Sequence, residues 1–196
     1  MKSFVNALLL CFVVFILTSC KKDNPVDSSP SVKQIWPLNP GNTWSFSTIE
    51  YDTTGAVTHS GAGALVVTTD TIVDGETWYH ISGVGWGGSM FYTNRSDGFF
   101  AMLNSGTGLT KGLLFKYPVN AGDSWNFGDQ YIFLQSTDTS ITVPAGTYHC
   151  YKYRLSMDDY YFCPGVGIIA QDSYSSTNSG RLYIEGRLSI TSVTLK

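Results

Sequence analysis

Two short segments of this 196-residue chain are close copies of each other. Residues 36–46 are WPLNPGNTWSF, and residues 117–127 are YPVNAGDSWNF. The identical positions are Pro37/Pro118, Asn39/Asn120, Gly41/Gly122, Trp44/Trp125 and Phe46/Phe127. In a repeat architecture each copy buries its apolar face against a neighbouring copy, so this feature constrains the fold before it says anything about chemistry. We expect two related halves, at about residues 36–116 and 117–196.

Each copy has the pattern of a turn followed by a β-strand. Glycine permits a tight bend, and Asn or Asp can hydrogen bond back to the local backbone. Trp and Phe stand two positions apart, which places both on one face of a strand. The four aromatic residues that we therefore expect in the core are Trp44, Phe46, Trp125 and Phe127.

The rest of the chain predicts an all-β protein. Short runs rich in β-forming residues alternate with Gly, Asn and Asp, and no 12-residue window has the apolar spacing of a helix. We expect an antiparallel β-sandwich or a β-roll or barrel, built from two related β-meander halves. The predicted strands are Thr43–Tyr51, Gly63–Val73, Thr77–Ser82, Met90–Asn94, Phe99–Leu103, Gly112–Tyr117, Ser124–Phe127, Tyr131–Thr137, Thr147–Leu155, Tyr160–Cys163, Gly167–Asp172, Arg181–Ile184 and Leu188–Leu195.

The first residues have the layout of a secretory signal peptide. Lys2 precedes an apolar run from Ala7 to Leu17, which is shorter than the ~20 residues of a membrane-spanning helix. The sequence Leu17-Thr18-Ser19-Cys20 resembles the lipobox of bacterial lipoproteins, which implies cleavage before Cys20. We expect a signal peptide at residues 1–19, a polar, proline-bearing tether at residues 20–34, and a single β-domain at residues 35–196.

The lipobox resemblance implies how the chain is held at a membrane. In such lipoproteins the cysteine thiol receives a diacylglycerol and the new amino terminus a third acyl chain (palmitate), which together anchor a protein stably. Lys21 stands where an aspartate would favour the inner membrane, so we expect the outer membrane, on either its periplasmic or its surface face. The alternatives are an uncleaved anchor and an ordinary signal peptide with a chance cysteine.

A hairpin in the second half can be assigned a register. If Cys150 lies opposite Cys163, then Lys152 faces Tyr161 and Arg154 faces Asp159 on the same side. An aromatic ladder of Tyr151/Phe162 and Tyr153/Tyr160 forms the other side. We predict a Cys150–Cys163 disulfide, with ~3 kcal/mol of stabilisation or less. Two free thiols, or a register slip at Ser156-Met157, are the alternatives.

Three segments resemble a group of bacterial lipoproteins to which no activity is assigned. They are WPLNPGNTW (36–44), VPAGTYHCYKY (143–153) and YYFCPGVGIIAQ (160–171). The group carries Phe-Pro-Leu-x-x-Gly-Asn-x-Trp, Val-Pro-Ala-Gly-Thr-Phe and Pro-Gly-Val-Gly motifs of outer-membrane-type lipoproteins. This resemblance implies a fold and a location but no reaction. Cys163 replaces an alanine of the group, so a disulfide would be particular to this chain.

Motifs for catalysis, metals or cofactors are weak. The formal net charge of −3 offers no basic patch for nucleic acid. His59, His80 and His149 lack metal-ligand spacing, so we predict no metal. Gly83–Gly88 matches a nucleotide fingerprint, but a strand follows where that motif needs a helix. Asp158 and Asp159 are adjacent and should point to opposite faces of a solvated turn. We predict no cofactor and no catalytic residues.

The aromatic content points instead to binding. Phe, Trp and Tyr make up 14% of the chain, and Trp86 lies in a glycine-rich segment where it could stack on a sugar ring. We expect a non-catalytic, lipid-anchored envelope lipoprotein that binds a glycan or an outer-membrane partner protein. The alternative is a carrier or chaperone for a lipid or another apolar ligand. A glycan hydrolase is the third candidate, and Trp86 could also fold back as a plug of its loop.

Overall fold

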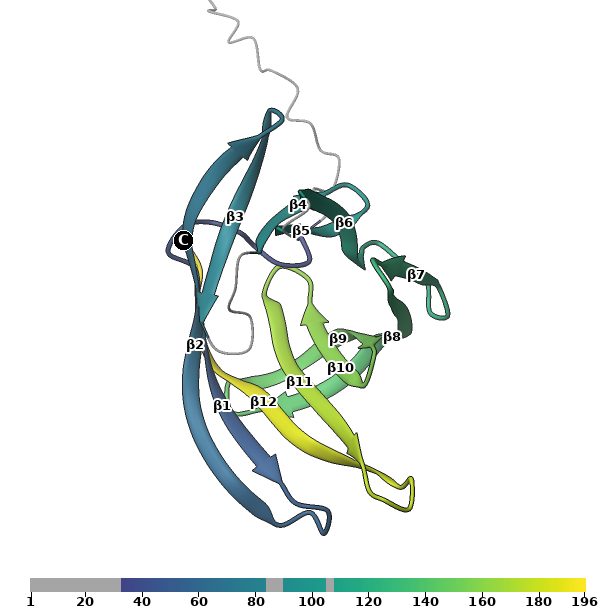
Figure 1. The fold of residues 1–196 in the computed structure, drawn as a ribbon. Helices are drawn as coiled ribbons and strands as arrows, with labels where there is room; N and C mark the ends of the chain where they lie inside the picture. The colour runs from purple at the N-terminus through teal and green to yellow at the C-terminus, as the bar shows by residue number, and fades with distance from the viewer. Residues whose placement is uncertain (1–32, 84–89, 105–107) are drawn as a thin grey trace, which may run out of the picture. The chain divides into compact units, whose positions relative to one another are not determined.

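Strands and turns make up the part of the chain that the structure, a computed structural model, describes: residues 33–83, 90–104 and 108–196 (Figure 1). No helix in those ranges is long and apolar enough to cross a membrane. The strands are β1 (Thr43–Tyr51), β2 (Val57–Val73), β3 (Glu76–Gly83), β4 (Phe91–Arg95), β5 (Gly98–Asn104), β6 (Leu109–Lys116), β7 (Ser124–Phe127), β8 (Gln130–Val143), β9 (Gly146–Leu155), β10 (Asp158–Cys163), β11 (Gly167–Ser176) and β12 (Leu182–Thr194).

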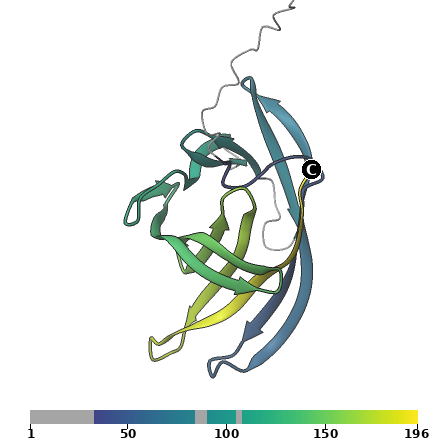
Figure 2. The same ribbon diagram turned by 180° about the vertical axis from the view of Figure 1, so that it is seen from behind.

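All these strands form one antiparallel sheet in the order β6-β5-β4-β3-β2-β1-β12-β11-β10-β9-β8-β7. The order describes two consecutive meanders, β1–β6 and β7–β12, which are joined where β1 pairs with β12 (Figures 1 and 2). The sheet curls until its two edge strands, β6 and β7, come near each other, so it is a nearly closed, barrel-like sheet. The predicted all-β fold with two related meander halves is confirmed.

The sequence repeat corresponds to a structural repeat. Gly41 and Gly122 occupy the same left-handed conformation, with φ of 90° and 89°. Each donates its backbone N–H to the second strand of its own hairpin, Gly41 to Val67 O at 2.7 Å and Gly122 to Leu134 O at 2.9 Å. Glycine is needed at both turns because a Cβ atom is strained at such φ values. The predicted turn-then-strand unit is therefore present in both halves.

The four repeat aromatics belong to the core to different extents. Trp44, Phe46 and Phe127 are buried, as predicted, whereas Trp125 is half-buried and packs against the edge of the core. The first residue of the first repeat also fills the interior. Trp36 is completely buried and its ring stacks on Phe99 with a centroid distance of 5.3 Å. The amino-terminal segment of the described domain is thus part of its hydrophobic core.

Several strand boundaries differ from prediction; for example, β8 ends at Val143 instead of Thr137, and β11 ends at Ser176 instead of Asp172. β2 begins at Val57 instead of Gly63, and the two predicted final strands are one continuous strand, β12. Gly186 lies in the interval between these two predicted strands. In the structure Gly186 pairs with Glu50 on one side and Ser173 on the other, beside a register shift at Ser173/Tyr174. A bulge accommodates this glycine within the sheet, which explains why the strand continues through it.

The register predicted for the β9–β10 hairpin is confirmed. Arg154 lies opposite Asp159, and Tyr151 lies opposite Phe162. Ser156 adopts a left-handed conformation with φ of 54°, which lets the two-residue turn close without a register slip. The same register places Asp158 and Asp159 on opposite faces of the sheet. Asp159 is completely buried, so the expectation of a fully solvated turn is wrong for this residue.

The predicted Cys150–Cys163 disulfide is absent from this structure, in which both residues are free thiols. The reason lies at the end of the hairpin. The β9–β10 ladder ends at the pair Tyr151 and Phe162, one position before the cysteines. Cys150 pairs with Thr139 of β8, while Cys163 pairs with Gly167 as the chain turns into β11. The β9–β10 ladder thus ends one pair before the cysteines, and each cysteine pairs with a residue of another element.

Candidate functional site

The two edge strands of the sheet face each other across an open seam. In the described ranges β6 pairs only with β5, and β7 only with β8, so no backbone ladder joins β6 to β7. Side chains bridge the seam instead. The indole N–H of Trp125 donates to the Leu114 carbonyl at 3.2 Å, and the Tyr153 hydroxyl donates to the Lys116 carbonyl at 2.8 Å. These donors satisfy carbonyls of β6 that a paired strand would otherwise have used.

A glycine allows close contact at one point of this seam. A Cβ atom placed on Gly112 of β6 would lie 2.8 Å from the ring of Phe127, which is at the end of β7. The Phe127 ring therefore rests directly on the β6 backbone. Beyond Phe127 the chain turns immediately at Gly128 and Asp129 into β8, since Phe127 pairs with Gln130. β7 is consequently too short to cover the rest of β6.

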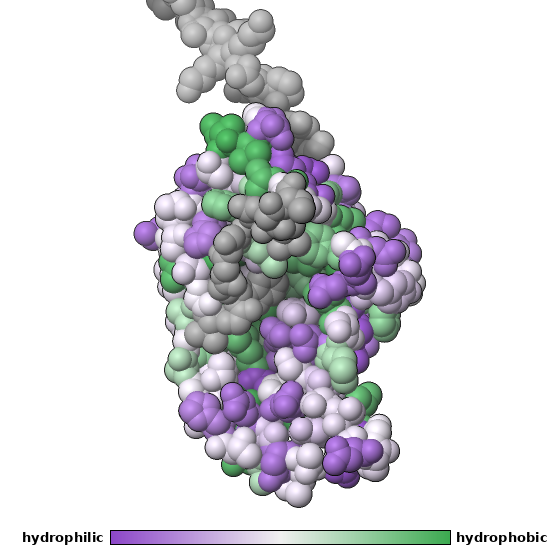
Figure 3. Space-filling model, in the orientation of Figure 1, coloured by the Kyte–Doolittle hydropathy of each residue, from purple (hydrophilic) through white to green (hydrophobic). Residues whose placement is uncertain are grey.

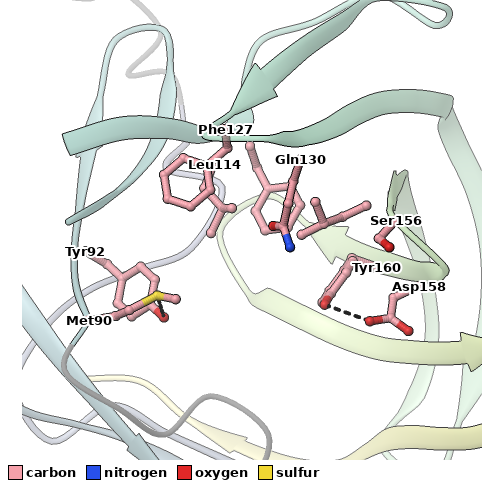
Figure 4. Close-up of a pocket in the computed structure, with 10 residues that line it drawn as sticks. Met90, Tyr92, Leu114, Phe127, Gln130, Ser156, Asp158 and Tyr160 are labelled. Carbon is pink, nitrogen blue, oxygen red and sulfur yellow. Dashed lines mark hydrogen bonds between the residues drawn. The ribbon is translucent and has the colours of Figure 1, made fainter. Parts of the chain in front are cut away.

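A pocket of about 330 Å³ opens where β7 ends (Figure 4). Both halves of the sheet contribute to it, β4 and β6 from the first half and β7 to β10 from the second. This volume is at the lower end of the range for small-molecule sites, ~300–1,000 Å³. The lining residues are Met90, Tyr92, Leu114, Phe115, Phe127, Gln130, Leu155, Ser156, Asp158 and Tyr160.

The walls of the pocket differ in chemistry. Met90 and Tyr92 lie on one side, and Tyr160 and Asp158 lie on the other (Figure 4). The Tyr92 hydroxyl donates to the Met90 sulfur at 3.3 Å, and the Tyr160 hydroxyl donates to the Asp158 carboxylate at 3.3 Å. Leu114 and Phe127 add apolar surface, while exposed Gln130 and Ser156 bring polar groups. The pocket can therefore hold a molecule with one apolar face and several polar groups.

Burial keeps the two pocket tyrosines neutral. The pKa of Tyr92 is raised because its hydroxyl is removed from water. The pKa of Tyr160 is also raised, first by burial and then by the negative charge of neighbouring Asp158. Both side chains thus present neutral rings and hydroxyl groups at physiological pH. Such groups can stack on a ligand and hydrogen bond to it.

The neighbouring carboxylates on the opposite face have a structural role. Asp159 binds Arg154 and Lys152, the latter at 3.0 Å, and Asp172 binds Arg187 at 2.6 Å. Both aspartates are buried, so their charges require these partners. Asp158 points into the pocket instead, although it is next to Asp159 in sequence.

The other residues singled out from the sequence do not join this pocket. Cys20 and Trp86 lie outside the described residues, so lipid attachment and sugar stacking at these positions stay predictions. His149 contacts Asp138 at 2.6 Å on an exposed strand surface, and His80 contacts Thr68 at 2.9 Å. Within residues 33–83, 90–104 and 108–196, no three His, Cys, Asp or Glu side chains are grouped to hold a metal ion.

Sequence reasoning missed most of the pocket. Gln130, Ser156 and Tyr160 belong to two separate hairpins of the second half, and Met90 and Tyr92 come from the first half. No local motif links them. The signal that was available is the short interval between the repeated Phe127 and the turn at Gly128-Asp129, which predicts a shorter strand than the one after Phe46.

The surface around the described elements is mostly polar or weakly apolar in the view of Figure 3. Apolar colour gathers at the upper end, over the tip of the β2–β3 hairpin, where Ile72 is 72% exposed. The pocket lies elsewhere, at the β6–β7 seam. Exposed apolar residues at a hairpin tip are common in soluble domains and do not by themselves mark a site.

Comparisons with known proteins report distant likenesses. No protein-family model matches the chain, and no curated protein matches its sequence. Among solved structures it is similar to an exported protein with a YmcC-like fold from Bacteroides fragilis, with 14% identity and a TM-score of 0.44 over 83% of this chain and 100% of that chain. It is also similar to a lipoprotein from Parabacteroides distasonis, with 11% identity and a TM-score of 0.43 over 83% of this chain and 99% of that chain. These descriptions apply to those two proteins.

Proposed function

We propose that this chain is a non-catalytic binding module of the bacterial cell envelope, and that the seam pocket holds one sugar ring of a glycan. Lipid on Cys20 would tether the domain to the outer membrane through the tether at residues 20–34. The observation that carries the proposal is the pairing of an aromatic and apolar wall with a polar wall in one pocket of about 330 Å³. A sugar ring has the same division, with an apolar face of C–H groups and a rim of hydroxyls.

Binding fits this pocket better than glycoside hydrolysis does. Glycosidases of the usual type need two carboxyl groups, ~5–10 Å apart, on either side of the scissile bond. Among the lining residues Asp158 is the single carboxylate. We therefore expect hydrogen bonds to the sugar hydroxyls from Asp158, Gln130 and Ser156. Tyr92 and Phe127 offer ring surface.

A carrier of lipid chains is the second candidate, because Met90, Leu114, Phe127 and Leu155 form continuous apolar surface in the pocket. An acyl chain would remove water from the carboxylate of Asp158 and leave the Tyr160 hydroxyl as its hydrogen-bond donor among the described residues. Burying a charged group that no cation balances is costly. We therefore rank the carrier below the glycan-binding module.

Calorimetric titration of the full-length protein in detergent micelles with envelope-type oligosaccharides tests the proposal. We expect saturable binding that Gln130→Ala weakens about tenfold, the effect of losing roughly 1.4 kcal/mol of hydrogen bonding. Gln135→Ala is the matched control, because Gln135 lies on the same strand and does not line the pocket. The Trp86→Ala variant, measured alongside, tests whether this residue contributes a stacking surface.

Two results would count against the proposal. If no oligosaccharide binds while fatty acids do, the carrier is the better description. If oligosaccharides bind and Gln130→Ala behaves like Gln135→Ala, the glycan site lies away from the seam pocket.

A further inference from the structure

Among the described residues, Asp158 differs from the neighbouring Asp159 and Asp172 in forming no ion pair. Asp159 and Asp172 are each held by an arginine on the opposite face of the sheet. Asp158 accepts a hydrogen bond from the Tyr160 hydroxyl at 3.3 Å, and no ion pair of Asp158 is formed within the described ranges. The half-buried carboxylate of Asp158 therefore contacts a neutral hydroxyl and no cation among the described residues.

The described residues around Asp158 supply no positive charge. No lysine or arginine is among the described residues that line the pocket. The lining includes four aromatic rings, from Tyr92, Phe115, Phe127 and Tyr160, and the face of an aromatic ring attracts cations. Every nearby group of the described lining is thus neutral or negative.

From this arrangement we infer that the pocket selects a sugar with a protonated amino group over the same sugar with a neutral, acetylated nitrogen. The ammonium would lie between the Asp158 carboxylate and the aromatic rings, while the sugar ring occupies the apolar wall. The inference rests on the proposed glycan-binding function and adds the chemical class of the ligand. A neutral sugar can fill the same space but leaves the charge of Asp158 unmatched.

The test compares three probes on the full-length protein in detergent micelles at low ionic strength: glucosamine, N-acetylglucosamine and ethanolamine. At about pH 6 an aliphatic amine is protonated and a carboxylate is ionised. We expect glucosamine to bind about tenfold more tightly than N-acetylglucosamine, the effect of roughly 1.4 kcal/mol of additional attraction. Ethanolamine carries the ammonium without the sugar ring, and we expect it to bind at least about tenfold more weakly than glucosamine.

The Asp158→Asn variant should remove the preference, because it should weaken glucosamine binding about tenfold more than it weakens N-acetylglucosamine binding. Asp70→Asn is the matched control, because Asp70 is exposed on β2 and does not line the pocket. Circular dichroism shows whether both variants fold. The comparison of glucosamine with N-acetylglucosamine on the unmodified protein does not depend on either variant.

The outcomes separate this inference from the proposed function. Equal binding of glucosamine and N-acetylglucosamine would overturn the inference while leaving the glycan-binding module in place. Ethanolamine binding as tightly as glucosamine would overturn the assignment of a sugar, since the ammonium alone would be sufficient. Binding of none of the sugars would remove the proposed function, and the inference with it.

Discussion

The two halves of the domain meet at two junctions, and these junctions differ in structure. At the first, β1 pairs with β12 from Thr43/Thr194 to Glu50/Gly186, with one register shift at Ser45/Phe46. At the second, β7 faces β6 with side-chain hydrogen bonds and no ladder among the described residues. The two junctions are equivalent in the order of the meanders, because each brings the first strand of one half to the last strand of the other.

The difference arises after the repeated Trp-x-Phe sequence. β1 continues for nine residues to Tyr51, whereas β7 has four residues and ends at Phe127. Gly128, with φ of 59°, begins the turn that reverses the chain there. A strand shortened at one junction leaves the sheet nearly closed and creates a pocket at the gap. Two copies of one structural unit thus form a hydrogen-bonded ladder at one junction and a pocket at the other.

The largest expected effect comes from replacing Trp44 and Trp125, the equivalent tryptophans of the two repeats. Trp44 at the closed junction is completely buried and donates to the Val166 carbonyl at 2.6 Å, while Trp125 at the open junction is half-buried. We expect Trp44→Ala to lower the free energy of unfolding by about 4 kcal/mol and Trp125→Ala by about 2 kcal/mol. Chemical denaturation measures both. Equal losses would mean that the open junction is packed as tightly as the closed one.

Hydrogen exchange tests the backbone at the two junctions. Peptides from β6 and β7 should exchange at least about 100-fold faster than peptides from β1 and β12, because edge strands open locally at lower free-energy cost. The measurement is mass spectrometry on the folded full-length protein in detergent. Protection of β6 equal to that of β12 would contradict an open junction.

The two cysteines beyond the end of the β9–β10 ladder allow a smaller comparison, between a buried thiol and a half-buried one. Burial, followed by the nearby Cys163, raises the pKa of the Cys150 thiol to about 12, and burial also raises the pKa of half-buried Cys163. A raised thiol pKa means little reactive thiolate near neutral pH. We expect iodoacetamide to modify Cys163 about tenfold faster than Cys150 in the folded protein. Faster modification of Cys150 in peptide mapping would contradict this burial.

Substitutions at two glycines should give the smallest effects. An added methyl at Gly112 would meet the Phe127 ring at 2.8 Å, whereas one at Gly186 of β12 would find its nearest atoms at 3.9 Å. Gly112→Ala should lower the free energy of unfolding by about 1 kcal/mol and disturb the pocket. Gly186→Ala should raise the free energy of unfolding by about 0.5 kcal/mol, because alanine restricts the unfolded chain. Thermal melts of both variants, with sugar titration of Gly112→Ala, measure these effects.

Local chemistry made much of the fold predictable. The repeated Gly41 and Gly122 turns, the inward Trp and Phe residues, and the β9–β10 register follow from rules that act within one hairpin. The single strand β12 was not predicted, because the bulge that accommodates Gly186 depends on neighbours on both sides. The free thiols were not predicted for a similar reason, since the pairing of Cys150 with β8 and of Cys163 with Gly167 involves residues outside the β9–β10 hairpin.

The sequence by itself determined that the domain is a β-sheet of two related halves, because turn conformation and side-chain alternation are local properties. Only the tertiary structure decided where those halves fail to join. The pocket depends on how far the sheet curls and on which side chains meet across its edges, and residues as distant in the chain as Tyr92 and Asp158 come together there. Such contacts result from packing of the whole sheet, which no single segment encodes.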